Sequence, residues 1–247
     1  VTLAPEGGAH QSTITASVGA ELPNLTYVEP AYATEVDWLL CHALSEVSRP
    51  DGSSTYLRLS TRPIDQAPFA AAAERLGVDC LLEQVLAGGY RLIDGDDDGA
   101  DVGRPGVTIV TTGAMAPEAI AAATELESEG VTATVVHLTS PDRVYRSWRA
   151  GFAQSTASAR LVSRRSHLHR LVPSAERRRP IVSVHDAASH SLAWLGSAIG
   201  TRQFALGVDR FGESGTIAEL HELVGIDAGS IVNAALIALS DFDTHDE

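Results

Sequence analysis

A histidine two residues after a glycine pair is the first candidate for chemistry in this sequence. The stretch APEGGAHQS places His10 after Gly7-Gly8 and before two polar residues. Glycine lets a backbone approach a ligand closely, because it has no Cβ. An imidazole near neutral pH can move a proton or donate a hydrogen bond to a developing oxyanion. His10 is therefore a candidate catalytic residue, although a purely structural loop would use the same residue types.

A second group of ionisable side chains, in the stretch HDAASH, lies at the carboxyl end of a strand predicted at 181–189. It contains His185, Asp186 and His190. Open α/β sheets bind ligands at the carboxyl ends of their strands, where this stretch lies. The sequence contains neither the GxSxG of a hydrolase nucleophile nor the HExxH of a zinc protease. His185 and His190 are therefore open to two interpretations, as substrate-binding or interface residues and as structural hydrogen-bonding residues.

The charge and composition exclude some functions. The net charge of −14 argues against a nucleic-acid partner, because phosphate binding needs a clustered positive surface. No apolar run approaches the roughly 20 residues of a membrane span, so no membrane partner is expected. No secretory signal pattern is present, and Cys41 and Cys80 are expected as buried free thiols. These features predict a cytoplasmic protein.

From residue 107 onward, short β-rich apolar runs alternate with helical patterns. This alternation predicts an α/β fold with a mostly parallel sheet and helices on both faces. The expected strands cover 107–113, 132–140, 181–189 and 203–208. The expected helices cover 117–130, 142–151, 192–200, 216–225 and 229–242. Between 151 and 180 lies an arginine-rich stretch, which is interpreted either as a surface loop or as a site for an acidic partner.

The residues before 107 form two further segments. Residues 1–62 contain an extended run at 25–30, an amphipathic helix at 35–47 and a strand-like run at 54–62. Residues 63–106 are expected to form a helical and acidic linker, because two helical patterns end in an aspartate- and glycine-rich run. The sequence is thus divided at residues 62 and 106.

Four stretches taken together resemble a known family. They are APEGGAHQS, TYVEPAYATEVDWLL, YLRLSTRP and GVDRFGESGTIAELHELVGIDAGSIVNAAL. Their order and spacing resemble the transketolase superfamily of thiamine diphosphate enzymes. Within it they are most similar to the homodimeric first, decarboxylating component of the pyruvate dehydrogenase complex. The resemblance runs through the whole chain and is weakest over 64–105 and 151–180.

The resemblance implies an organisation and an activity. Residues 1–62 would be the second half of a pyrimidine-binding domain, and 107–247 a transketolase C-terminal-type domain. The full enzyme would use thiamine diphosphate and Mg²⁺, decarboxylate pyruvate and pass the acyl group to a lipoyl acyltransferase component. It would be a homodimer. The family's metal-binding GDG-to-Asn motif is absent and its activating glutamate would precede Val1, so this chain alone is expected to be an inactive piece that binds no cofactor.

The resemblance also implies roles for individual residues. His10 matches the family's active-site histidine, and Glu6 matches less securely because transketolases have one more residue in this loop. Tyr32, in Pro30-Ala31-Tyr32, stands where transketolases carry an aspartate that reads a sugar hydroxyl. Its presence favours a small 2-oxo acid, because a sugar hydroxyl left unpaired in the site would be costly. Arg58 and Arg62 are candidates for contacts to a substrate carboxylate.

Two other functions remain open, and the chain could also be a natural subunit of a split enzyme that another polypeptide completes. A transketolase-like two-carbon transferase fits the same motifs. A non-catalytic dimerisation or interaction module would use only the sheet of the C-terminal domain.

Overall fold

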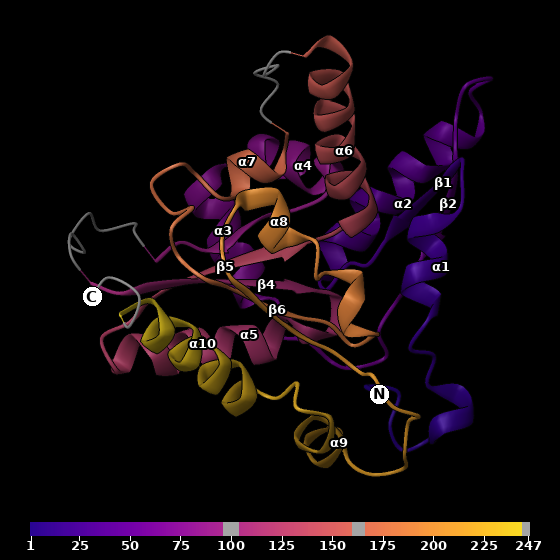
Figure 1. Cartoon of the computed structure of the whole chain (residues 1–247). Coiled ribbons are helices and arrows are strands. Elements are labelled where there is room, and N and C mark those ends of the chain that lie inside the picture. Colours follow the sequence, from indigo (N-terminus) through magenta and orange to yellow (C-terminus); the bar gives the residue numbers. More distant parts are fainter. Residues whose placement is uncertain (96–103, 160–165, 244–247) are drawn as a thin grey trace.

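The computed structural model describes residues 1–95, 104–159 and 166–243. The chain forms one large sheet flanked by helices, with a small two-stranded sheet packed beside it (Figure 1). The strands of the small sheet are β1 (Leu25–Val28) and β2 (Ser54–Leu57), which run parallel. The strands of the large sheet are β3 (Tyr90–Ile93), β4 (Gly106–Thr112), β5 (Thr132–Leu138), β6 (Ile181–Val184) and β7 (Gln203–Leu206).

The large sheet has the order β3-β5-β4-β6-β7. All its pairings are parallel except that of β3, which runs antiparallel to β5 at one edge. The prediction of an α/β fold with a mostly parallel sheet is confirmed. β3 was not expected, because its four residues, YRLI, follow a helix directly and have no turn signal before them other than Gly88-Gly89.

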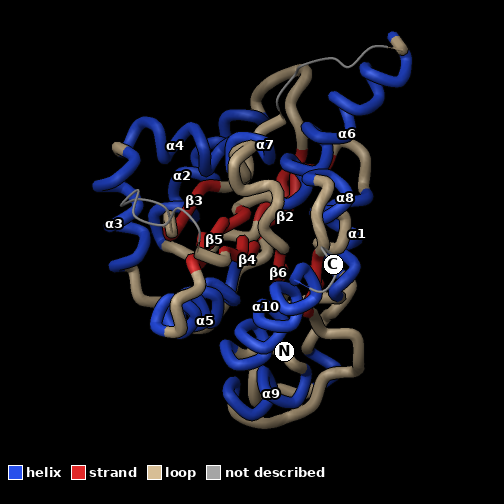
Figure 2. The backbone as a smooth tube through the Cα atoms, turned by 60° about the vertical axis from the view of Figure 1, so that its left-hand side comes forward, coloured by secondary structure: helices blue, strands red, loops and turns tan. Residues whose placement is uncertain are grey.

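Helices cover both faces of the large sheet (Figure 2). Before the sheet come the short 3₁₀ helix η1 (Gly8–His10) and then α1 (Thr15–Glu21), α2 (Ala33–Val47), α3 (Ala67–Leu76) and α4 (Val78–Ala87). The later helices are η2 (Gly113–Met115), α5 (Ala116–Ser128), α6 (Pro141–Ser158), α7 (Leu168–Leu171), η3 (Ser189–Ser191), α8 (Leu195–Ile199), α9 (Ile217–Val224) and α10 (Ala228–Asp243).

Successive residues of the central strands contribute to two separate hydrophobic cores, one on each face of the large sheet. Ile109 and Val135 contribute to a core that also contains residues of α5 and α10. Their neighbours Val110 and Val136 contribute to a second core with residues of α6, α7 and α8. Because successive side chains of a strand point to opposite faces, continuous apolar strands are what a sheet covered on both sides requires.

The segment between residues 63 and 106 is more than a connection. It contains α3 and α4, in agreement with the predicted helical character, and also β3, whose Tyr90 pairs with His137 of β5. Most of its acidic run, 96–103, lies outside the described residues, as does 160–165 of the arginine-rich stretch. The division of the chain at residues 62 and 106 stays a prediction.

Both cysteines lie at the surface, so the expectation of buried thiols is wrong. The buried stripe of α2 is narrow and consists of Glu35, Leu39 and Ala43, spaced four residues apart. Cys41 lies off this stripe. Both thiols are free of disulfide bonds.

One segment of the described chain, Ile217–Ser240, is long and apolar enough to cross a membrane by composition, with a mean hydropathy of 1.7. Gly225, with φ of 72°, ends α9 inside this segment. α10 then packs against α5 and the strands β4, β6 and β7. The segment therefore consists of two separate helices of the fold.

Candidate active site

A pocket of about 170 Å³ lies where the carboxyl ends of several strands meet. β1 supplies Glu29, β2 is followed by Arg58, and β6 is followed by Asp186. The turn after β4 adds Gly113 and Ala114. The other lining residues are Val1, Thr2, Leu3, His10, Gln11, Ser12, Thr15, Leu59, Ser60 and Thr61.

Strand β1 is fixed at this edge by backbone hydrogen bonds. The Glu29 N–H donates to the carbonyl of Thr139 (2.8 Å), and the Glu29 carbonyl accepts from the N–H of Gly113 (3.2 Å). A side chain beyond Gly113 Cα would lie within 2.6 Å of Glu29 Cγ, so the glycine is required here by close approach and by its φ of 51°. The Glu29 carboxylate therefore has a fixed position at the end of the large sheet.

The Glu29 carboxylate is the centre of a buried polar network. It accepts hydrogen bonds from the Tyr27 hydroxyl and the Arg58 guanidinium, and His185 Nε2 lies 2.8 Å from its Oε2. Burial raises the pKa of the Glu29 carboxyl, but the charge of Arg58 and the contact with His185 outweigh it and hold that pKa well below its usual range. Glu29 is therefore an anion in the interior.

Arg58 is held from two sides and still reaches the pocket. Its guanidinium donates to Glu29 and to the backbone carbonyl of Asp186 (2.6 Å). Burial opposes the charge, but Glu29 raises the pKa of Arg58, so the guanidinium stays positive. Its side chain is 19% exposed and lines the pocket. A fixed, partly exposed guanidinium is suited to bind a carboxylate or a phosphate.

His10 lies at the pocket on a bent backbone. Gly7 has φ of 85°, and the N–H of His10 donates to the Gly7 carbonyl (3.1 Å), which closes the turn of η1. The imidazole is exposed and lines the same pocket as Arg58. The structure thus brings together His10 and Arg58, two of the residues that the sequence singled out.

His185 lies just behind the pocket wall. Its Nδ1 is 2.6 Å from the hydroxyl of Ser191, and its Nε2 faces Glu29. Because both ring nitrogens are engaged inside the protein and the side chain is 1% exposed, His185 acts on the pocket through Glu29. Asp186 next to it accepts the Thr2 N–H (3.0 Å) and lines the pocket.

Four predicted site residues lie away from the pocket. Tyr32 is fully buried and packs against Phe69 and His137. Arg62 forms an ion pair with Glu118 of α5 (2.9 Å) and borders a different hollow. Glu6 is exposed and is not among the lining residues of the pocket, and His190 contacts Ser17 of α1 (2.9 Å) at the surface.

Glu29 is a pocket residue that the sequence did not single out, and Asp186 was noted only as a member of the stretch HDAASH. A signal for Glu29 was present in the stretch LTYVEP, where a lone acidic residue ends an apolar strand and is followed by proline. A charge at such a position is rarely buried without a partner. Its partner Arg58 ends the neighbouring strand, at a separation that only the fold reveals.

Among residues 1–95, 104–159 and 166–243, no group of three or more His, Cys, Asp or Glu side chains is arranged to hold a metal ion. The two carboxylates at the pocket, Glu29 and Asp186, are both engaged by protein donors. The pocket therefore offers a positive guanidinium and an imidazole, which suit an anionic ligand rather than a cation.

The sequence matches a known family. Residues 88–227 match the transketolase-like TK C-terminal domain family model, and the chain belongs to this family. The sequence as a whole is 28% identical to Transketolase 10 of Craterostigma plantagineum, over 95% of this chain and 29% of that protein. It is 30% identical to the 6-deoxy-6-sulfo-D-fructose transketolase subunit SqwH of Clostridium sp. (strain MSTE9), over 95% of this chain and 61% of that protein.

Solved structures with the same fold are also transketolases. The enzyme from Leishmania mexicana superposes with a TM-score of 0.64 at 20% identity, over 98% of this chain and 29% of that one. A split-gene transketolase, described as an inactive beta4 tetramer, superposes with a TM-score of 0.57 at 21% identity over 94% of this chain and 63% of that one. The chain thus spans between about a third and two thirds of the length of these relatives.

Proposed function

We propose that this chain is the C-terminal part of a thiamine diphosphate-dependent transketolase-type enzyme that transfers a two-carbon unit from a ketose phosphate to an aldose phosphate. The observation that carries the proposal is the meeting of His10 and Arg58 at one pocket, in a chain similar to transketolases over almost its whole length. An imidazole beside a fixed guanidinium can protonate or hydrogen-bond a reacting oxygen while the substrate's anionic end is bound.

In this proposal each residue has a separate task. Arg58 binds the anionic group of the substrate, because its guanidinium is positive, partly exposed and lines the pocket. Glu29 and the Asp186 carbonyl orient Arg58 and keep its guanidinium in one position. His10, exposed at the pocket, donates its proton or hydrogen bond to the reacting oxygen. His185 stabilises the Glu29 carboxylate from behind.

The described residues do not by themselves fit thiamine diphosphate with its metal ion. They include no metal-binding cluster, and a pocket of about 170 Å³ is too small for the whole cofactor. We infer that parts of the polypeptide outside this chain bind the diphosphate and the Mg²⁺, and that the chain alone is inactive. In the full enzyme a second copy would supply the rest of the site, which makes a homodimer the expected assembly.

The test is an activity assay on the whole polypeptide that contains this chain. Purified protein with thiamine diphosphate and Mg²⁺ is given a ketose phosphate donor and an aldose phosphate acceptor, and the new ketose is quantified. The proposal expects turnover by the whole polypeptide and none above background by residues 1–247 alone. Turnover by the isolated chain would overturn the proposal. So would the absence of turnover by the whole polypeptide with the ketose phosphate donor.

A second candidate function is decarboxylation of a 2-oxo acid such as pyruvate, with acyl transfer to a lipoyl acyltransferase component. One feature of the pocket favours it. Both pocket carboxylates already have partners within the protein. Glu29 contacts Arg58 and His185, and Asp186 accepts the N–H of Thr2, so neither carboxylate is available to accept a hydrogen bond from a sugar hydroxyl. Pyruvate has no hydroxyl that needs such a partner.

The same enzyme preparation separates the two candidates. Pyruvate replaces the ketose phosphate, and an artificial electron acceptor or a lipoyl domain receives the product. Turnover with pyruvate alone supports the 2-oxo acid function, and turnover with the ketose phosphate alone supports the transferase. If His10→Ala and Arg58→Met leave either activity unchanged, the pocket has no catalytic role and the chain is a dimerisation module.

A further inference from the structure

Two loops that are far apart in the sequence are pressed together beside the pocket. The first is the histidine loop, residues 4–12, and the second is the bracing loop, residues 207–216, between β7 and α9. We infer that Gln11 is a positioning residue and that the bracing loop, through Gln11, sets the position of His10. This inference rests on the proposed function for the role of His10, but the contact between the loops stands independently of it.

The approach of the two backbones leaves no room for side chains. A Cβ on Gly8 would lie 2.1 Å from a ring carbon of Phe211 and 2.3 Å from the carbonyl oxygen of Gly212. A Cβ on Gly212 would lie 1.9 Å from Gln11 Oε1. Glycines on both loops are therefore needed for this contact, since real Cβ atoms do not approach other atoms so closely.

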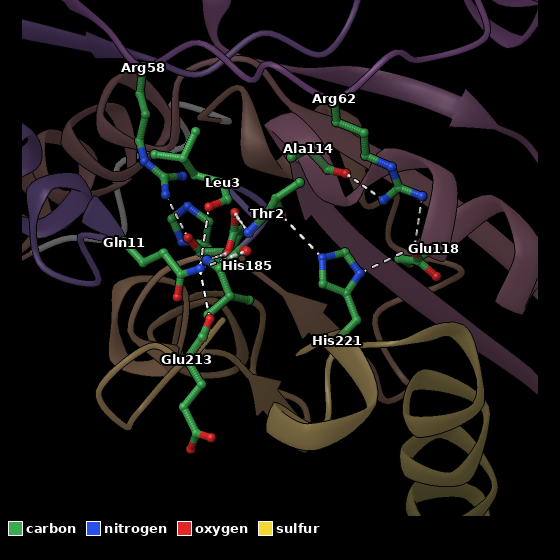
Figure 3. Close-up of polar contacts among 12 residues, drawn as sticks. Thr2, Leu3, Gln11, Arg58, Arg62, Ala114, Glu118, His185, Glu213 and His221 are labelled. Atoms are coloured by element: carbon green, nitrogen blue, oxygen red, sulfur yellow. Dashed lines mark hydrogen bonds and ion pairs between the residues drawn. The ribbon is translucent and has the colours of Figure 1, made fainter. Parts of the chain in front are cut away.

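The Gln11 side chain joins the two loops and is itself buried. Its carboxamide nitrogen points at the carbonyl oxygens of Glu213 (3.1 Å), Leu3 (3.3 Å) and Val1 (3.5 Å). Figure 3 shows this amide between Leu3 and Glu213. The assignment of the nitrogen to this end of the amide follows from its surroundings, which are all acceptors. One amide group thus ties residues 1–3 and the histidine loop to the bracing loop.

A second contact holds the same two parts of the chain together. His221 of α9, which follows the bracing loop, has Nε2 3.1 Å from the Thr2 hydroxyl and Nδ1 3.3 Å from Glu118 of α5 (Figure 3). His221 is 1% exposed. The start of the chain is therefore attached to the large-sheet part through Gln11–Glu213 and Thr2–His221, in addition to the hydrogen bond from the Thr2 N–H to Asp186.

The imidazole of His10 has no comparable support of its own. Within the described part of the chain it makes no side-chain hydrogen bond, and its backbone is held by the turn from Gly7 and by its neighbour Gln11. The location of the ring therefore depends on the contact between the two loops. A group that must meet a reacting atom has to be held within a fraction of an ångström, which is what such a brace provides.

The test uses Gln11→Glu, which keeps the shape of the side chain but turns a carboxylate oxygen toward three carbonyl oxygens. Gln154→Glu, on the exposed part of α6, is the matched control for the added charge. Gly212→Ala is a second variant, in which the substituted residue lies in the bracing loop and not in the histidine loop. Amide hydrogen exchange of residues 1–247 is the first readout. In Gln11→Glu and in Gly212→Ala we expect the amides of His10 and Gln11 to exchange about tenfold faster, while the exchange rates of amides in β4 and β5 stay the same. In the Gln154→Glu control we expect all these rates to be unchanged.

The second readout is kinetic and uses the whole polypeptide. Loss of positioning lowers kcat about tenfold or more and leaves KM for the anionic donor nearly unchanged, since Arg58 is untouched. An unchanged exchange rate at His10 in both variants would overturn the inference. It would also be overturned if exchange were faster but kcat were unchanged, in an enzyme that His10→Ala inactivates. Faster exchange in an enzyme that His10→Ala leaves fully active would overturn the proposed function while leaving the contact between the loops intact.

Discussion

Glu29 carries its charge in the interior, where an unpaired carboxylate would be strongly destabilising. Arg58, His185 and the Tyr27 hydroxyl surround it, so every oxygen has a donor. Burial and Glu29 together raise the pKa of the Tyr27 hydroxyl far above its usual value, so Tyr27 keeps the proton that it donates to Glu29. A network of this kind is most sensitive to the removal of one member.

Glu29→Gln should lower the free energy of unfolding by about 3–5 kcal/mol, because it leaves the Arg58 charge without its partner. The double variant Glu29→Gln/Arg58→Met should recover part of this loss, since it removes both charges. Urea denaturation measures both values. A single variant within about 0.5 kcal/mol of the parent chain would contradict this view of the network.

The same carboxylate predicts how stability depends on pH. The pKa of Glu29 is lower in the folded chain than its ordinary value of 4.5. Its contribution is therefore fully present above about pH 4.5 and is lost as the pH falls toward the lowered pKa. Denaturation between pH 3 and 7 should show stability falling below about pH 4.5, and more shallowly in Glu29→Gln. Equal slopes would show that Glu29 is not the group responsible.

The residue types alone could predict His10, and the family resemblance added Arg58, but neither could identify their partners. His10 stood out because a glycine pair precedes it in the same loop, and Arg58 because it lies in the stretch YLRLSTRP that resembles the family. Tyr32 shows the limit of this reasoning. Its position in the sequence suggested a substrate contact, yet its ring is fully buried against Phe69 and His137. Which way a side chain points at the end of a strand depends on neighbours that are distant in the sequence.

Among the elements, α6 shows how the small sheet is attached to the large one. Ser140, which precedes α6, accepts a hydrogen bond from the N–H of Arg143 (3.2 Å) and donates one to the carbonyl of Tyr27 in β1 (2.5 Å). Asp142 in the first turn accepts the Tyr27 N–H (3.2 Å). The N-terminus of α6 therefore fixes β1 in place and, with it, Glu29.

Ser140→Ala should lower the free energy of unfolding by about 1–2 kcal/mol, because it removes a helix cap and leaves the buried Tyr27 carbonyl without this donor. Ser45→Ala, whose hydroxyl bonds only to the carbonyl of His42 on the exposed side of α2, is the control and should change stability by less than about 0.5 kcal/mol. Thermal or urea unfolding compares the two. Equal effects would mean that the cap of α6 contributes no special stability.

Most elements could be predicted because their apolar runs and turns are local. The strands and helices from 107 onward follow the predicted alternation, but α6 extends to Ser158 and α7 lies within the arginine-rich stretch at 151–180, so part of that stretch is helical and is not a loop. β3 could not be predicted, because a four-residue strand at a sheet edge is fixed by its pairing with β5 rather than by its own sequence. The apolar pattern of α2 also predicts more burial than the structure shows. Only one narrow stripe of this helix is buried, and three of its apolar residues are exposed, namely Leu40, Leu44 and Val47.

At the scale of the whole molecule, the pocket lies where residues 1–62 meet the large sheet. Glu29 and Arg58 come from the small sheet, Asp186 and Gly113 come from the large one, and the bracing loop closes over the histidine loop. Neither part forms this pocket alone. The chain spans 29% of Transketolase 10.

The most direct test of the account is the effect of His10→Ala on both stability and catalysis. Because the imidazole is exposed and unbonded within the described chain, the variant should unfold within about 0.5 kcal/mol of the parent. In the whole polypeptide, with thiamine diphosphate, Mg²⁺ and the donor that it accepts, kcat should fall about 100-fold or more. A kcat equal to that of the parent enzyme, at equal stability, would contradict the assignment of this pocket as the active site.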